Sequence, residues 1–398
     1  MKFSDLDGKR VALWGLGRET KAFRVQLEAR LPSASISAVI DDATPEPDAR
    51  AAITDADVLV RSPGVSIYKP LIREARTPTT TPTALWMAQR RGRHVIGVTG
   101  TKGKSTTATI IAHLLADATT VELAGNIGRA VIDLLDTPLE TWVVCELSSY
   151  QIADLTVGPE VAVLTNLSRE HTDWHGSEEQ YRTDKLRLFD LPGVRAAVRP
   201  PGDRGWPLVV APEQIPLRGV HNAENVAAAV AAIEAAGFAV PPLPEALAGL
   251  EPLPHRLQTV QVCADGTEWI DDSISTTPES TIAALAAFGG RQVVLIAGGS
   301  ERDQDYDRLG QAVATRKAPT RLILLPDTGA RLASAAATHG FGEDRMSTAG
   351  DMREATALAR GLVEPGGVVL LSPAAPSFNQ YANFEERGDD FATLALRP

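Results

Sequence analysis

The chain has 398 residues, of which 44% are hydrophobic and 22% charged, and its formal net charge is −11. This composition is ordinary for a globular protein of two or three domains, and the acidic charge argues against a nucleic-acid-binding surface. No apolar run reaches the ~20 residues of a membrane span and the N-terminus has no signal-peptide core, so we expect a cytoplasmic protein that binds no membrane. Cys145 and Cys263 lie in apolar runs and are expected to be buried thiols in a reducing compartment.

Short apolar runs alternate along the chain with longer segments of helical spacing. This rhythm predicts βαβ units, and therefore an α/β fold with mostly parallel sheets. An Arg-rich segment at 90–93, interpreted as a polar hinge, and a Pro-rich stretch at 241–254 divide the chain into three predicted domains, 1–93, 94–253 and 254–398. The predicted strands are 11–14, 58–60, 95–98, 142–145, 161–164, 293–296, 322–325 and 368–371, and the Ala-rich helices include 225–236 and 280–288.

The first domain carries three turns that each follow a predicted strand. Gly15-Leu16-Gly17 resembles a dinucleotide-binding turn, although Thr20 stands where the third glycine is expected. A second strand ends at Asp41-Asp42, where a ribose-binding acid is expected, and Ser62-Pro63-Gly64 follows a third. Because parallel strands bring their carboxyl ends to one edge, a diphosphate-bearing ligand is one interpretation of these turns. Purely structural turns are the other.

The central domain opens with the most informative motif of the chain. The predicted strand 95–98 leads into Gly100-Thr101-Lys102-Gly103-Lys104-Ser105-Thr106, and a helix with apolar periodicity follows. Backbone N–H groups at a helix N-terminus favour phosphate, Lys104 adds a full charge, and Ser105 offers a hydroxyl to Mg²⁺. The spacing is tighter than the usual phosphate loop, because Val98 occupies the place of its first glycine. We favour a nucleotide site over a structural turn.

Polar residues recur downstream at strand ends and helix starts. Glu146 ends a predicted strand, where a carboxylate can hold Mg²⁺ beside Ser105 or simply be solvated. By their residue types alone, His171 is as readily a surface histidine as a metal ligand, and Lys185 is a solvated lysine on a helix. Asn222 and Asn225 are spaced i and i+3, which places two amides on one helix face, suited to an adenine edge or to capping that helix.

The ordered series of these motifs resembles the Mur ligases, most closely their glutamate-adding, MurD-type branch, over essentially the whole chain. It continues through Gly125–Gly128, His255-Arg256, Asp271-Asp272-Ser273, Gly298-Gly299 and Asn383–Gly388. The resemblance implies a three-domain Mur ligase architecture: a Rossmann-like N-terminal domain, a P-loop ATPase central domain and a Rossmann-like C-terminal domain. It also implies an ATP-dependent ligase of peptidoglycan precursor synthesis, which joins glutamate to UDP-N-acetylmuramoyl-L-alanine through an acyl phosphate.

The resemblance further implies a role for individual residues. Two Mg²⁺ ions are expected, one of them held through a carbamylated Lys185, and the metal-holding residues are Ser105, Glu146, His171 and Lys185. Lys104 joins Glu146, His171 and Lys185 as catalytic residues. ATP contacts are expected at Gly100, Thr101, Lys102, Gly103, Lys104, Ser105, Thr106, Asn222, Asn225, Arg256 and Asp272, and UDP-sugar contacts at Gly15, Gly17, Arg18, Ser62, Pro63, Gly64 and Asn126.

The sequence departs from most MurD-type ligases in the expected glutamate pocket, which comprises Ile274, Thr276, Arg302, Ser377 and Phe384. Ile274 replaces one lysine and Arg302 replaces another. Relocated charges fit a substrate of inverted chirality. The string Asp-Ser-Ile-Ser-Thr-Thr-Pro at 272–278 is similar to the branch that adds L-glutamate and relies on a separate downstream epimerase. In the first domain, Arg18-Glu19 replaces Leu-Thr, and Ala43 replaces an arginine.

We therefore expect a monomeric L-glutamate ligase whose partners are its small-molecule substrates and, after it, an epimerase. Three alternatives remain open from the sequence: a D-glutamate ligase whose pocket has drifted, a folylpolyglutamate synthase-like ligase, and a non-catalytic binding protein on the same scaffold.

Overall fold

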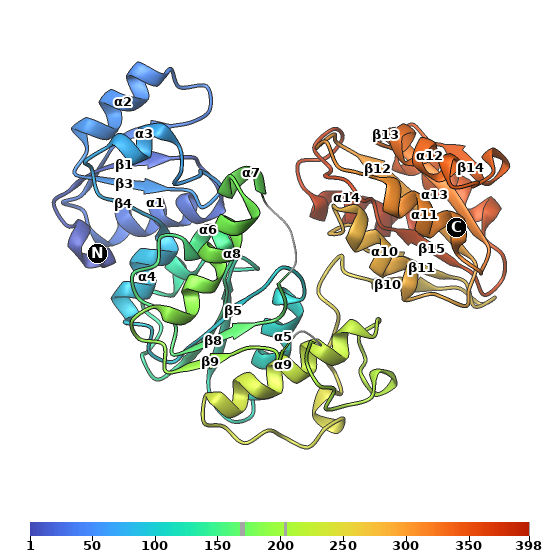
Figure 1. The fold of residues 1–398 in the computed structure, drawn as a ribbon, viewed down its shortest axis with the longest axis horizontal. Helices are drawn as coiled ribbons and strands as arrows, with labels where there is room; N and C mark the ends of the chain where they lie inside the picture. Colours follow the sequence, from blue (N-terminus) through green and yellow to red (C-terminus); the bar gives the residue numbers. More distant parts are fainter. Residues whose placement is uncertain (168–171, 203–204, 398) are drawn as a thin grey trace. The chain divides into compact units, whose positions relative to one another are not determined.

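The computed structural model describes residues 1–167, 172–202 and 205–397 (Figure 1). Two compact units make up the chain: Met1–Pro216 together with His221–Leu250, and Leu217–Val220 together with Glu251–Pro398. The predicted α/β fold with mostly parallel sheets is confirmed, and all eight predicted strands are present. None of the helices in the described ranges has the length and apolar character of a membrane span.

The first unit begins with a four-stranded parallel sheet of order β2-β1-β3-β4. The strands β1 and β3 are almost continuously apolar in sequence and buried along nearly their whole length. This pattern is typical of a parallel sheet whose two faces are both covered. Its elements are η1 (Phe3–Leu6), β1 (Arg10–Trp14), α1 (Arg18–Arg30), β2 (Ser35–Ile40), α2 (Glu46–Asp55), β3 (Val58–Arg61), α3 (Pro70–Glu74), β4 (Thr79–Thr80) and α4 (Pro82–Arg90).

A second parallel sheet in the same unit has five strands in the order β6-β7-β5-β8-β9. Helices α5 and α9 pack against each other on one face, and α4, α6 and α8 lie on the other side (Figure 1). Its strands are β5 (Val95–Thr99), β6 (Val121–Gly125), β7 (Trp142–Glu146), β8 (Val161–Leu164) and β9 (Ala196–Val198). Its helices are α5 (Lys104–Leu115), η2 (Val131–Leu134), α6 (Ser149–Ile152), α7 (Thr172–His175), α8 (Glu178–Leu186), η3 (Arg187–Asp190), η4 (Pro212–Gln214), α9 (His221–Ala235) and η5 (Glu245–Leu247).

The segment joining these two sheets is a packed junction, so the interpretation of 90–93 as a polar hinge is wrong. Arg90 is 4% exposed, and its guanidinium donates to the backbone carbonyls of Arg93, Thr137, Pro138, Leu139 and Thr141. A guanidinium has five N–H donors, and here they satisfy carbonyls of Arg93 and of the loop between η2 and β7. One apolar cluster also contains side chains of both sheets, including Leu13, Trp86 and Val143.

The second unit contains a six-stranded sheet of order β10-β11-β15-β12-β13-β14, parallel except for β10. Alternate residues of β12 belong to two different apolar clusters, so α10 to α12 cover one face and α13 and α14 the other. Its strands are β10 (Gln258–Val262), β11 (Glu268–Asp271), β12 (Val293–Gly299), β13 (Thr320–Asp327), β14 (Met346–Thr348) and β15 (Val368–Leu371). Its helices are α10 (Pro278–Ala286), α11 (Asp307–Thr315), α12 (Gly329–Thr338), η6 (Glu343–Arg345), α13 (Met352–Leu362) and α14 (Phe384–Ala395).

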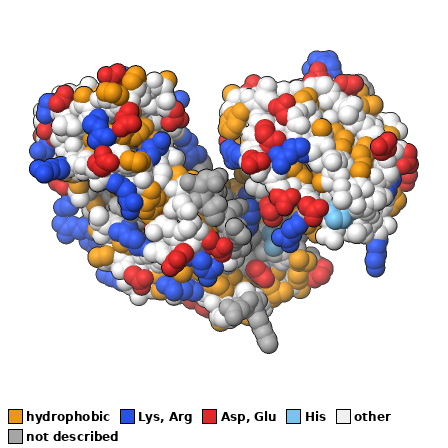
Figure 2. Space-filling model, turned by 45° about the horizontal axis from the view of Figure 1, so that its top comes forward, with side chains coloured by type: hydrophobic (Ala, Val, Ile, Leu, Met, Phe, Trp, Pro, Cys, Tyr) orange, Lys and Arg blue, Asp and Glu red, His pale blue; other side chains and the backbone are white. Residues whose placement is uncertain are grey.

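The two cysteines differ in their burial. Cys145 is buried, and burial raises the pKa of its thiol. Cys263 directly follows the edge strand β10 and is partly exposed, contrary to the prediction. On the face drawn in Figure 2, acidic and basic side chains are interspersed over both units.

The proposed domain boundaries at 93/94 and 253/254 fall between sheets.

Replacing Arg90 tests whether this junction is a packed one. We expect Arg90→Met to lower the free energy of unfolding by about 2–4 kcal/mol, because five backbone carbonyls, including that of the buried Thr141, lose their donor. The exposed Arg93→Ala is the matched control and should change stability by less than about 0.5 kcal/mol. Equal effects of the two substitutions in chemical denaturation would restore the hinge interpretation.

Candidate active site

The glycine-rich loop after β5 is packed too closely for side chains at two of its positions. A Cβ atom at Gly100 (φ +153°) would lie 1.9 Å from Thr165 Oγ1, and one at Gly103 (φ +78°) would lie 2.3 Å from Asn225 Oδ1. The residues that follow β8 also hold the loop, since the Thr101 N–H donates to the Asn166 carbonyl (3.0 Å). The loop is therefore shaped by the protein around it.

Helix α5 begins at Lys104, directly after this loop. The Lys104 ammonium donates to the Thr101 carbonyl (2.9 Å), so the charge lies over the loop. The N–H groups of the first helical turn have no partner within their own helix, and they face the loop with the positive end of the helix dipole. This is the arrangement that binds a phosphate chain. Ser105 and Thr106 belong to the first turn of α5, and Lys102 lies in the loop before it.

Glu146 lies beside this loop and carries an oxygen suited to a cation. It ends β7, is paired in register with Val98 of β5, and is 1% exposed. Its Oε1 accepts from the Asn126 amide (2.9 Å), while its Oε2 is buried without a partner among the described residues. A buried carboxylate oxygen without a donor is costly, and a divalent cation would satisfy it. The residues present therefore fit a Mg²⁺ ion.

Lys185 of α8 lies against the same loop, so the interpretation as a solvated lysine is wrong. Its side chain is buried, and Nζ donates to the Gly100 carbonyl (2.6 Å). Tyr181, one helical turn earlier, shares a hydrogen bond with Thr101 Oγ1 (2.9 Å). Helix α8 thus packs on the loop through two side chains. His171 lies outside the described residues.

The two asparagines of α9 are both buried, and they interact with each other and with α5. Asn225 Nδ2 donates to Asn222 Oδ1 (2.9 Å), and Thr107 Oγ1 donates to Asn225 Oδ1 (3.3 Å). Asn225 therefore fastens α9 to the first turns of α5, a role for which its spacing gave no signal. An adenine contact of this pair stays a prediction.

In the first sheet, two of the predicted turns lie in contact. A Cβ atom at Gly17 would lie 2.7 Å from Ser62 Oγ, and one at Gly15 (φ +79°) would lie 3.1 Å from Ser62 Cβ. The Arg18 guanidinium donates to the carbonyls of Gly125 (2.9 Å) and Asn126 (2.8 Å), which joins the first turn to the end of β6. The carbonyls of Pro63 and Gly64 both accept from the Trp174 indole (3.1 Å each).

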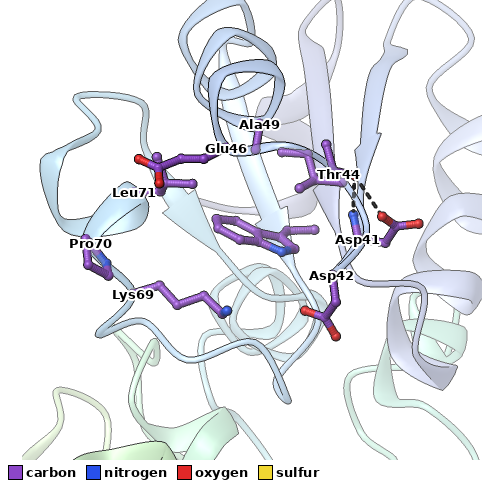
Figure 3. A pocket seen from close by; sticks show the side chains of 10 residues that line it. Asp41, Asp42, Thr44, Glu46, Ala49, Lys69, Pro70 and Leu71 are labelled. Carbon is purple, nitrogen blue, oxygen red and sulfur yellow. Dashed lines mark hydrogen bonds between the residues drawn. The ribbon is translucent and has the colours of Figure 1, made fainter.

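A pocket of about 240 Å³ opens at the carboxyl ends of β1 and β2. Hydrogen bonds from Thr44 and from the Ala43 N–H hold the pKa of Asp41 below its usual value, so this carboxylate is engaged in its own turn. A ribose-binding role for Asp42 stays a prediction. Figure 3 shows Lys69 reaching into the pocket from the side opposite Asp41 and Asp42. The full lining is Trp14, Ile40, Asp41, Asp42, Thr44, Glu46, Ala49, Lys69, Pro70 and Leu71.

Lys69 and Trp14 escaped the sequence analysis. The Lys69 ammonium lies 5.6 Å from the centroid of the Trp14 ring, and the Trp14 Nε1–H is buried without a partner in the part of the chain that the structure describes. A lysine before Pro70 leaves no recognisable pattern, whereas the position of Trp14 at the end of β1 was a usable signal.

The second unit gathers its polar loops at the carboxyl ends of β11, β15 and β12. Asp272 is 2% exposed and accepts from Ser372 Oγ (2.7 Å) and the Leu257 N–H (3.2 Å). Burial raises the pKa of Asp272 to about 6, against the hydrogen bonds of Ser275 and Ser372 and the charge of Arg256. Arg256 Nε is buried without a partner among the residues described.

A buried arginine ties two of these loops together. Arg387 of α14 donates to the Ser273 carbonyl (2.8 Å), to Ser273 Oγ (3.0 Å) and to the Ala375 carbonyl (3.0 Å). Burial lowers the pKa of Arg387 to about 10, so the guanidinium stays charged at neutral pH. The loops that carry the expected glutamate-pocket residues are thereby fixed to one helix.

Two polar atoms in these loops are buried without a partner within the described ranges. One is Ser377 Oγ, a predicted pocket atom, and the other is Gln304 Oε1, which the sequence analysis missed. The Gln304 amide nitrogen donates to the Thr276 carbonyl (2.9 Å), and this hydrogen bond identifies the unpartnered atom as the oxygen Oε1. Ile274 and Phe384 are half-buried, and Arg302 is exposed.

Comparison with known protein families identifies the family of this chain. A family model described as the Mur ligase middle domain matches residues 98–198, and one described as the Mur ligase, glutamate ligase domain matches residues 255–375. The chain belongs to the Mur ligase family. A UDP-N-acetylmuramoyl-L-alanine--L-glutamate ligase from Salinispora tropica is 39% identical to it, over 98% of each chain.

Solved structures agree on the fold of this Mur ligase. The UDP-N-acetylmuramate-alanine ligase MurC from Thermotoga maritima superposes with a TM-score of 0.63 at 16% identity, covering 97% of this chain and 98% of that one. A bifunctional folylpolyglutamate synthase/dihydrofolate synthase from Yersinia pestis has a TM-score of 0.56 at 17% identity, and covers 79% of this chain and 93% of that one. The three-domain Mur ligase architecture expected from the sequence is confirmed.

The raised pKa of Asp272 makes the stability of the chain depend on pH. The Asp272 carboxyl holds its proton more tightly in the native state than in the unfolded chain. Protonation of Asp272 therefore stabilises the fold fully below pH 3.8, and this contribution is lost as pH rises through about 6. We expect Asp272→Asn to remove roughly 2–2.5 kcal/mol of the decrease in unfolding free energy between pH 4 and 7. Denaturation at several pH values checks this, with the exposed Glu364→Gln as control; parallel pH profiles for wild type and Asp272→Asn would contradict it.

Proposed function

We propose that this Mur ligase uses ATP to join L-glutamate to UDP-N-acetylmuramoyl-L-alanine in peptidoglycan precursor synthesis. The observation that carries the proposal is the near full-length similarity to a relative that bears this activity in its name. A carboxylate does not acylate an amine at neutral pH, so ATP first converts the alanyl carboxylate into an acyl phosphate. The amino group of glutamate then attacks the acyl phosphate.

The glycine-rich loop and α5 are the proposed ATP site. Backbone N–H groups at the N-terminus of α5 and the Lys104 ammonium would hold the phosphate chain, and Asn222, Asn225, Arg256 and Asp272 are proposed contacts of the nucleoside and ribose. Ser105 and the buried Glu146 Oε2 would hold one Mg²⁺. When bound, Mg²⁺ neutralises charge that develops on the transferred phosphoryl group.

Lys185 is proposed to be carbamylated and to hold a second Mg²⁺ together with His171. A carbamate nitrogen keeps one N–H, so the hydrogen bond to the Gly100 carbonyl is compatible with the modification. The modification turns a buried cation beside the glycine-rich loop, which would repel a metal ion, into a carboxylate-like anion that can bind one. A mass of the intact chain without the added CO₂, together with full activity of Lys185→Ala, would exclude it.

The UDP-sugar is proposed to bind along the edge of the first sheet. The turns of Gly15, Gly17 and Arg18 and of Ser62–Gly64 would hold the diphosphate, and Asn126 would lie near the acceptor sugar and alanine. The pocket at Asp42 and Lys69 has the size and polarity for the nucleoside end of that ligand. Lys69 supplies a cation near the place where Ala43 replaces the usual arginine.

The glutamate pocket is proposed to be built from Ile274, Thr276, Arg302, Ser377 and Phe384, with Gln304 added. Glutamate carries two carboxylates, which only accept hydrogen bonds, and one amino group, which donates. The Ser377 hydroxyl and the Arg302 guanidinium therefore suit the carboxylates, and the buried Gln304 Oε1 suits the amino group. Ile274 removes a cation from this pocket, so a carboxylate must be anchored differently than in D-glutamate ligases.

Phosphate release with UDP-N-acetylmuramoyl-L-alanine, ATP and Mg²⁺, with L- or D-glutamate in parallel, tests the function. We expect turnover with L-glutamate alone. Turnover with D-glutamate alone would instead support the D-glutamate alternative, which the retained Ser377 and Phe384 leave chemically reasonable. Silence with both amino acids would overturn the ligase proposal in favour of a binding protein.

Glu146 tests the metal site separately. We expect Glu146→Gln to lower kcat by about 100-fold or more, because a neutral amide replaces the buried carboxylate that faces the cation. Binding of the UDP-sugar, measured by calorimetry without ATP or Mg²⁺, should not change. The exposed Glu140→Gln is the control, and a kcat equal to wild type in Glu146→Gln would remove this residue from the metal site.

A further inference from the structure

A chain of four hydrogen-bonded side chains crosses the first unit beside the proposed site. Ser149 begins α6, His175 ends α7, Asp184 lies on α8, and Tyr68 lies in the loop before α3. His175 Nε2 lies 2.9 Å from Ser149 Oγ, and His175 Nδ1 lies 2.6 Å from Asp184 Oδ2. The Tyr68 hydroxyl donates to both oxygens of Asp184 (2.8 and 2.7 Å).

The proton positions follow from the donors that meet Asp184. Its carboxylate accepts from Tyr68, from the Gln180 amide (2.8 Å) and from His175, so the proton of the imidazole lies on Nδ1. Nε2 shares a hydrogen bond with the Ser149 hydroxyl. This order of side chains is that of serine hydrolases, but Ser149 and His175 are both buried and offer no surface to a substrate. The network therefore holds the elements that carry these four side chains in place.

The network connects the two ends of the proposed site. Asp184 directly precedes Lys185, whose ammonium donates to the phosphate loop. Tyr68 belongs to the same loop as Ser62–Gly64, and that loop is fastened to α7 by the Trp174 indole and by a hydrogen bond from Ser66 Oγ to the Trp174 carbonyl (2.8 Å). Tyr150, next to Ser149, stacks on Trp174 with ring centroids 4.6 Å apart.

We infer that Tyr68, His175, Asp184 and Ser149 are positioning residues that couple the 62–64 loop to the lysine of α8. A buried polar network is stable only when each member is satisfied, so a shift of the 62–64 loop changes the placement of α8 against the phosphate loop. Occupation of one end therefore favours occupation of the other. The inference rests on the proposed function for the identity of the two ligands.

Calorimetry on the full chain measures this coupling directly. The affinity for UDP-N-acetylmuramoyl-L-alanine is determined alone and with a saturating non-hydrolysable ATP analogue and Mg²⁺. In the wild type we expect the analogue to tighten binding by about 5-fold or more, and in Tyr68→Phe and Asp184→Asn we expect the ratio to fall towards 1. Melting curves show that each variant is folded.

The second unit offers a matched control, because Tyr381 donates to Asp390 (2.7 Å) in a pair of the same chemistry. Tyr381→Phe should keep the wild-type ratio. An unchanged ratio in folded Tyr68→Phe and Asp184→Asn would overturn the coupling and leave the network a purely structural one. A wild-type chain that does not bind the UDP-sugar would overturn the proposed function and the inference with it.

Discussion

The close packing of the phosphate loop is the constraint on which the first unit depends. Its backbone approaches Thr165 and Asn225 so closely that Gly100 and Gly103 admit no Cβ atom. The loop is therefore fixed by the end of β8 and by α9, and Lys185 and Tyr181 of α8 bind to it from another element. Asn225 and Lys185, which are proposed to contact ATP and metal, thus also shape the loop, and we expect this loop to be formed before a nucleotide binds.

In the second unit, a buried charged side chain holds the loops in place. The guanidinium of Arg387 is buried and ties the loop after β11 to the loop after β15. With the loop after β15 held, Ser377 Oγ can remain without a protein partner among the described residues. Gln304 Oε1, in the loop after β12, is likewise without one there, and its amide donates to the Thr276 carbonyl. Unsatisfied buried polar atoms destabilise a fold, and they persist at sites that a ligand completes. These two atoms therefore support the proposed glutamate pocket, where a bound ligand would satisfy them.

Local patterns in the sequence predicted the strands, the glycine-rich loop and Glu146, because apolar periodicity and strand ends are properties of neighbouring residues. They failed where the decisive contact is distant in sequence. Arg90 was interpreted as part of a polar hinge because the carbonyls it satisfies lie around residue 140. Tyr68 and Asp184 are 116 positions apart, and no spacing rule connects them. Lys69 and Gln304 are ordinary polar residues until the fold places them beside a pocket or a buried carbonyl.

A binding titration of Gly103→Ala with Mg·ADP tests the preformed loop most directly. The added methyl group would meet Asn225 Oδ1 at 2.3 Å in a left-handed backbone conformation, so we expect the affinity to fall by about 10- to 100-fold while the UDP-sugar still binds. Gly361→Ala, where a Cβ atom meets nothing within 4 Å, should bind Mg·ADP like the wild type. Wild-type affinity in Gly103→Ala would contradict the account.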